Sequence, residues 1–173
     1  MALQAARSSA RVDDDGDLVL FEDQDRGRWD QQLIALGFDH FEKSMVGEQV
    51  SEYHAQAAIA ATHARAAAVG STDWNMILEF FDQLLAINRS PVIALNRAVA
   101  VSKVHGPAAA LAAIEPLETD RKLSDYYLSL ALRGHLLLEL GRQGEAADCF
   151  RAALECRCSE PERRFLKRKL ARC

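Results

Sequence analysis

The sequence predicts an all-α protein built as a right-handed stack of antiparallel helix pairs. Apolar residues recur at steps of three and four, most clearly over 73–87, as in helices with one buried face. Capping residues, glycines and prolines divide the chain into segments of helix length. The composition is 49% hydrophobic but only 7% aromatic, with Ala-rich runs at 55–68 and 108–113, so the core must form by close helix approach.

The length of 173 residues fits one domain, 1–173. Within it we distinguish a helix end and turn (1–30), a helix pair with an amphipathic helix (31–88), and repeats with a capping helix (89–173). A formal net charge of -4 argues against the chain as a whole binding nucleic acid, which requires a basic face. No apolar run is long enough for a membrane span, and four late cysteines without a signal peptide indicate reduced thiols in the cytoplasm.

The first part of the chain contains the one segment that favours extended structure. Residues 1–10 are strong helix formers without a cap, which is typical of the end of a helix that begins elsewhere. An Asp-Gly turn with extended arms then predicts a short β-hairpin near Asp13–Leu20.

Three helices are expected in the middle of the chain. The first spans Arg28–Met45, with Asp25 as its candidate cap and Gly47 as its breaker. The second covers 48–68 and ends before Gly70. The third, 73–87, places Trp74, Ile77, Leu78, Phe81, Leu84 and Leu85 on one face.

Two helix pairs and a last helix complete the predicted stack. Residues 91–104 and 107–114 form one pair, and Ser124–Leu154 forms the next, turning at 141–144. In the second pair, Gly134, Ala146 and Phe150 stand where tetratricopeptide-type repeats place small residues and an aromatic. A capping box from Ser159 to Glu162 starts a basic helix, 161–172, that covers the open end.

The sequence offers no constellation for catalysis, for a cofactor or for a metal. The five histidines never pair at i, i+4, the thiols of Cys156 and Cys158 are too close for a zinc knuckle, and no phosphate loop or nucleophile elbow is present. The basic last helix is interpreted as a solvated capping face, with a nucleic-acid contact as the alternative.

Three segments, in this order, resemble a known family. They are Leu18–Asp30 (LVLFEDQDRGRWD), Tyr53–Ala61 (YHAQAAIAA) and Ser90–Val101 (SPVIALNRAVAV). Together they are similar to the C-terminal extension of bacterial sigma factors of the extracytoplasmic-function type, whose members carry a tetratricopeptide-like domain. His54 departs from the more apolar residue expected before Gln56.

The resemblance implies a regulatory domain without chemistry of its own. The full protein would direct RNA polymerase to promoter DNA through N-terminal regions absent from this chain. The extension would hold or position those regions, or receive a regulatory protein, and would not itself contact nucleic acid. The protein-interaction residues carried by the three segments are Gln24, Asp25, Arg26, Trp29, Tyr53, Gln56, Asn96 and Arg97.

For four of these residues a structural interpretation competes. Trp29 and Tyr53 also fit a plain core role. Asn96 with Arg97 can hold a partner carboxylate, or Asn96 can tie neighbouring helices together while Arg97 stays exposed.

Two other classes of function remain open. A free-standing tetratricopeptide-like adaptor would bind a peptide or protein in its groove. A ligand-binding or enzymatic domain would need a deep pocket with converging polar groups.

Overall fold

A computed structural model of the chain describes residues 1–44 and 51–173. The predicted positions of Met45, Gly47 and Glu48 lie outside these ranges. The chain divides into two compact units, Met1–Arg89 and Ser90–Cys173. The boundary falls beside the division expected at 88/89. The single domain and the handedness of the stack stay predictions.

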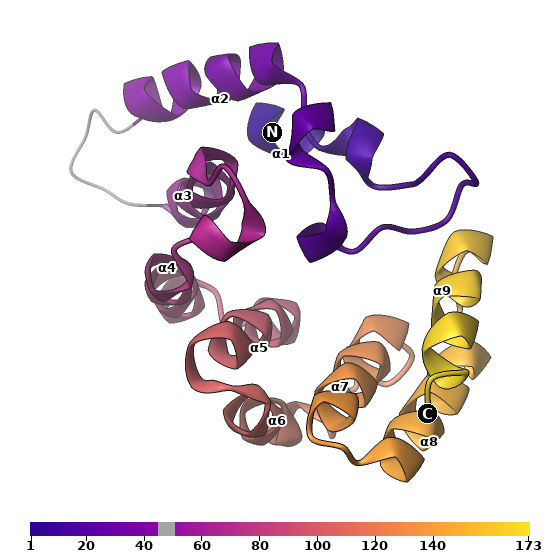
Figure 1. Cartoon of the computed structure of the whole chain (residues 1–173). Coiled ribbons are helices and arrows are strands. Elements are labelled where there is room, and N and C mark those ends of the chain that lie inside the picture. The colour runs from indigo at the N-terminus through magenta and orange to yellow at the C-terminus, as the bar shows by residue number, and fades with distance from the viewer. Residues whose placement is uncertain (45–50) are drawn as a thin grey trace. The chain divides into compact units, whose positions relative to one another are not determined.

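The described residues are helical, and they contain no strand, which confirms the all-α class. In the first unit the helices are α1 (Ala2–Ala5), α2 (Gln31–Ser44), α3 (Glu52–Arg65) and α4 (Trp74–Ile87). Short 3-10 turns lie between them, η1 (Ser8–Ala10), η2 (Phe21–Asp23), η3 (Arg26–Arg28) and η4 (Val69–Ser71). The second unit has α5 (Pro91–His105), α6 (Pro107–Ile114), η5 (Glu115–Leu117), α7 (Tyr127–Glu139), α8 (Gln143–Glu155) and α9 (Glu160–Leu170) (Figure 1).

The expected β-hairpin is reduced to a single antiparallel bridge between Val12 and Leu18. Gly16 turns the chain with a φ of 75°, and the Asp13 carboxylate accepts from the backbone N–H groups of Asp15 and Asp17. The arms extend no further because η2 begins at Phe21, so the prediction of two strands was wrong.

The predicted start of the first long helix was also wrong. Asp30, and not Asp25, caps α2, accepting from the N–H groups of Gln32 and Leu33 at 2.9 and 3.0 Å. Asp25 instead caps η3 through the N–H of Gly27. Trp29 therefore lies before α2, in extended backbone, and not on its face.

Helix α3 ends at Arg65, three residues before the expected end at Ala68, whereas α4 follows the predicted pattern. Asp73 caps α4, where Ile77, Leu78 and Leu84 are buried. Helix α4 packs along α3 (Figure 1). Helix α1 packs on α2 through Leu3, whose side chain fills the space beside Gly37.

The second unit is built on two helix pairs, α5 with α6 and α7 with α8 (Figure 1). Gly106, with a φ of 85°, ends α5 before Pro107 starts α6. Helix α7 begins at Tyr127 and not at the expected Ser124, whose hydroxyl donates to the Arg121 carbonyl.

The core of the second unit confirms the predicted close helix approach. Phe150 is fully buried against Gly134, where an added Cβ would lie 2.9 Å from the ring Cζ. The predicted capping box starts α9, and Glu162 within it also accepts from the hydroxyl of Tyr127 on α7. Leu166 of α9 is buried in the same core. The predicted lid therefore covers the α7–α8 pair.

We predict that Gly134→Ala destabilises the protein although alanine favours helices. The new methyl group overlaps the buried ring of Phe150, and overpacking of this kind costs about 1–3 kcal/mol. Urea denaturation measures this loss. Gly144→Ala on α8 is the matched control, because no atom lies within 4 Å of its added Cβ, and it should be neutral or stabilising. Equal stability of the two variants would contradict the close approach.

Candidate functional site

The first family-like segment, Leu18–Asp30, folds in the first unit as the two short turns η2 and η3. Neither turn has an extensive hydrogen-bond ladder of its own. The segment is therefore held in place by what its side chains contact.

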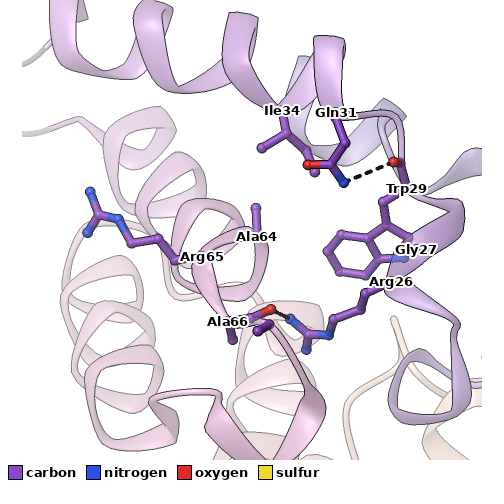
Figure 2. Close-up of a pocket in the computed structure, with 9 residues that line it drawn as sticks. Arg26, Gly27, Trp29, Gln31, Ile34, Ala64, Arg65 and Ala66 are labelled. Atoms are coloured by element: carbon purple, nitrogen blue, oxygen red, sulfur yellow. Dashed lines mark hydrogen bonds between the residues drawn. The ribbon is translucent and has the colours of Figure 1, made fainter.

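Arg26 ties this segment to the C-terminal end of α3. Its Nη1 donates to the carbonyl oxygens of His63 and Ala66, at 2.5 and 2.6 Å, and its Nη2 donates to Thr72 Oγ1 at 3.0 Å. Figure 2 shows the side chain reaching the Ala66 carbonyl. The last carbonyls of a helix lack partners within the helix and favour a nearby cation. Arg26 thus acts as a helix cap supplied from a distant part of the chain.

Aromatic rings surround the Arg26 guanidinium. Its Cζ lies 5.0 Å from the Trp29 ring centre and 5.7 Å from that of Phe21. The His63 ring meets Phe21 edge-on at 4.4 Å and Trp74 at 5.2 Å between ring centres. Since cations are attracted to aromatic faces, the rings and the guanidinium hold one another in place.

A second guanidinium shares the same two rings. Arg7, at the start of η1, places its Cζ 4.1 Å from the Phe21 ring centre and 5.7 Å from that of Trp29. We call Arg7, Phe21, Arg26, Trp29 and His63 the arginine–aromatic cluster. Its members come from four separate stretches of the first unit.

Burial and like charges lower the pKa values in this cluster. Desolvation, followed by the charges of Arg11 and Arg26, lowers the pKa of Arg7 to about 10. Desolvation likewise lowers the pKa of Arg26. For His63, desolvation and the two arginines lower the pKa to about 4, so the imidazole is neutral at pH 7.

A pocket of about 230 Å³ lies beside the cluster. Arg26, Trp29 and Ile34 line it together with the last turn of α3 and the residues just after it, Ala64 to Ala67. Figure 2 shows the pocket. Gln31 closes one side and donates to the Trp29 carbonyl at 3.2 Å. The side chain of Arg65 points away from Trp29 and Arg26 (Figure 2). Its Cζ lies 5.5 Å from the centre of the Phe38 ring. The pocket is small, its lining is more polar than apolar, and Arg26 and Arg65 are both among the residues that line it.

The predicted interaction residues of the first unit separate into a buried and an exposed set. Gln24 and Trp29 are only 6% and 4% exposed and belong to the core. Asp25 is an exposed cap of η3. Tyr53, 74% exposed, and Gln56 both face solvent on α3. The structural interpretation therefore holds for Trp29 and not for Tyr53.

Asn96 and Arg97 lie on α5 of the second unit. Asn96 is exposed and Arg97 is half-buried. Val92 and Val99, four residues before and three residues after Asn96, are exposed on the same helix face. Sequence reasoning missed these two valines, although their helical spacing from Asn96 was available as a signal.

Sequence reasoning also missed Arg7, Phe21 and His63. Arg7 lies in a segment interpreted as a helix end, and His63 is one of the five histidines whose spacing does not fit a metal site. Nothing in their local sequence shows that they meet, because the contacts join residues far apart in the chain.

Across residues 1–44 and 51–173, no group of three or more His, Cys, Asp or Glu side chains could hold a metal ion. Within the same ranges, no helix has the length and apolar character needed to cross a membrane.

The fold and the cluster define a protein of paired helices with an arginine–aromatic cluster in its first unit. Comparisons with known proteins add two findings. Residues 1–45 match DUF6596, a family of unknown function. The chain is 42% identical over 170 residues to the "Uncharacterized protein R00370" of Rhizobium meliloti (strain 1021). The match covers 98% of this chain but spans only 40% of that relative's length. No solved structure matches the chain.

We predict that Arg26→Gln lowers the free energy of unfolding by about 2–4 kcal/mol. The change leaves the carbonyls of His63 and Ala66 without their charged donor. Arg28→Gln, on the same turn, is the control. Its contact to Asp14 is 3.7 Å long and solvent-exposed, so it should change stability by less than about 0.5 kcal/mol. Chemical denaturation separates the two, and equal losses would contradict the capping role.

We also predict that His63 makes stability depend on pH. Its pKa is about 4 in the folded protein and 6.5 when exposed, so the unfolded chain binds the extra proton between these values. The contribution is complete above about pH 6.5 and is lost as the pH falls toward 4, by up to about 3 kcal/mol.

His63→Phe keeps a ring against Phe21 and Trp74 and should flatten this pH dependence in denaturation curves. His105→Gln, at an exposed position on α5, should leave it unchanged. An unaltered pH slope in His63→Phe would show that another group is responsible.

Proposed function

We propose that this chain is the regulatory, protein-interaction domain of a bacterial sigma factor of the extracytoplasmic-function type. The proposal starts from the resemblance of Leu18–Asp30, Tyr53–Ala61 and Ser90–Val101 to the C-terminal extension of that family. The all-helical fold of packed helix pairs supports it, since such folds present extended surfaces to partners.

The observation that carries the proposal is the joining of the first two family-like segments. Arg26, from the first segment, caps α3, the helix that contains the second. The occurrence of both segments together in the family-like pattern then has a physical reason. They form one folded body that displays Tyr53 and Gln56 on its surface.

The third segment supplies a candidate contact surface on α5. Val92, Asn96 and Val99 form an exposed strip at helical spacing, with an amide between two apolar side chains. Interfaces commonly combine apolar area with a few directional hydrogen bonds. This strip is suited to a protein partner, either the promoter-binding regions of the proposed full-length sigma factor or a regulatory protein.

The proposed working context is transcription initiation in the bacterial cytoplasm. Contacts to RNA polymerase and promoter DNA would be made by regions outside this chain, and the domain would carry out no chemistry itself. The Rhizobium meliloti relative is longer than its matched part, which is compatible with further regions in that protein.

The competing function is a tetratricopeptide-like adaptor that binds an unrelated peptide or protein. The exposed strip on α5 would serve such an adaptor equally well. Binding to the promoter-binding regions distinguishes the two functions.

The proposal predicts that removing this domain changes transcription in vitro. RNA polymerase would be supplied with the full-length sigma factor or with a form lacking the domain, on a promoter located by footprinting. A change in initiation, up or down, is expected because the domain positions the promoter-binding regions. Identical initiation by the two forms would contradict the proposed regulation and favour the adaptor.

A second prediction concerns the strip on α5. Asn96→Ala combined with Val99→Ala should weaken binding of the promoter-binding regions by about tenfold or more in calorimetry. Melting should hardly change, since both side chains are exposed and alanine favours helices. Glu79→Ala with Gln83→Ala, exposed on α4, is the control and should bind normally. Full binding by the Asn96/Val99 variant would remove this surface from the proposal.

A further inference from the structure

The arginine–aromatic cluster contains two cations and no carboxylate partner. Nearby acids are engaged elsewhere: Asp25 caps η3, and Asp30, whose backbone N–H donates to the Ala6 carbonyl, caps α2. The charges that act on Arg7 are those of Arg11 and Arg26, both positive. The cluster is therefore a local excess of positive charge in a chain of net charge -4.

The two arginines of the cluster differ in how their donors are used. Both terminal nitrogens of Arg26 donate within the protein. The Arg7 side chain makes no hydrogen bond or ion pair with any described residue, whereas the Arg7 backbone carbonyl accepts from the Ala10 N–H. Its Nε is buried without a partner, whereas its terminal nitrogens are not among the buried atoms. Arg7 thus presents an unused pair of donors toward solvent.

The cluster also fixes the position of the Arg7 guanidinium. The Phe21 ring lies 4.1 Å from its Cζ, and the Trp29 ring adds a second contact. Side chains that are already ordered lose less freedom when they bind. A half-buried arginine held on aromatic rings is also a frequent centre of binding energy in protein interfaces.

We propose that Arg7 is a carboxylate-binding site, which takes the side chain of an aspartate or glutamate from a partner protein. A guanidinium edge and a carboxylate are both planar and form two parallel hydrogen bonds. Only one guanidinium is available here, which suits one carboxylate better than a phosphate group with its larger charge. The site goes beyond the proposed transcription role and does not depend on it.

The experiment uses the 173-residue chain and follows the Arg7 Nε–H signal by nuclear magnetic resonance during titration. Sodium acetate is the probe, and sodium chloride at equal ionic strength is the reference. Acetate should shift the Arg7 signal with saturation, beyond any change caused by chloride. Arg7→Gln, followed through the Trp29 indole signal, should lower the acetate affinity tenfold or more.

Two further variants separate this site from general effects. Arg7→Lys keeps the charge without the planar fork, so it should bind acetate less well than the native chain and better than Arg7→Gln. It serves as the test if Arg7→Gln does not fold. Arg65→Gln removes an exposed arginine stacked on Phe38 and should leave acetate binding unchanged.

Three results would overturn the proposal. Equal shifts with acetate and chloride would show only a salt effect. Undiminished acetate binding in Arg7→Gln would place the anion elsewhere. Saturable binding of inorganic phosphate without binding of acetate would show that the site does not select carboxylates. Each of these results is independent of the transcription assay, so the two proposals can fail separately.

Discussion

The hydrogen bonds from Arg26 to the end of α3 are the constraint on which the first unit depends. Three acceptors, the carbonyls of His63 and Ala66 and the hydroxyl of Thr72, converge on one guanidinium. The irregular segment Leu18–Asp30 is thereby fixed against regular helices, and Phe21, which packs on Trp29, is brought into contact with His63. A single long side chain replaces the hydrogen-bond ladder that this segment lacks.

In the second unit the helices are joined mainly by apolar packing and not by a charged side chain. Gly134 lets the ring of Phe150 approach the α7 backbone, and the α7–α8 pair is then covered by Leu166 of α9. The Tyr127 hydroxyl on α7 also donates a hydrogen bond to Glu162 on α9, and this directional bond supplements the apolar contact. Burial and the hydrogen bond to Glu162 raise the pKa of Tyr127, so its hydroxyl stays a donor at neutral pH. Apolar packing thus joins α7, α8 and α9, whereas in the first unit Arg26 adds a charged clamp to the apolar packing of its helices.

The sequence was sufficient where the determining signals are local. Helix α6 has the expected bounds, α4 begins after the expected Asp73 cap, and the Ser159–Glu162 capping box lies where the spacing placed it. Local reasoning failed at the start of α2, where Asp25 was the predicted N-cap but Asp30 accepts the hydrogen bonds of the first turn. It could not identify Arg26 as a cap of α3, because the partners lie 37 to 46 residues further along the chain. The cluster around Arg7 escaped for the same reason.

Native-state hydrogen exchange in Arg26→Gln tests the central physical claim most directly. If Arg26 ties Leu18–Asp30 to α3, the amides of α3 and η4 should exchange faster in this variant than in the native chain or in Arg28→Gln. Acceleration should be largest near Thr72 and the last turn of α3, where the lost hydrogen bonds were made. Unchanged exchange at these amides would contradict the claim and show that apolar packing alone holds the segment.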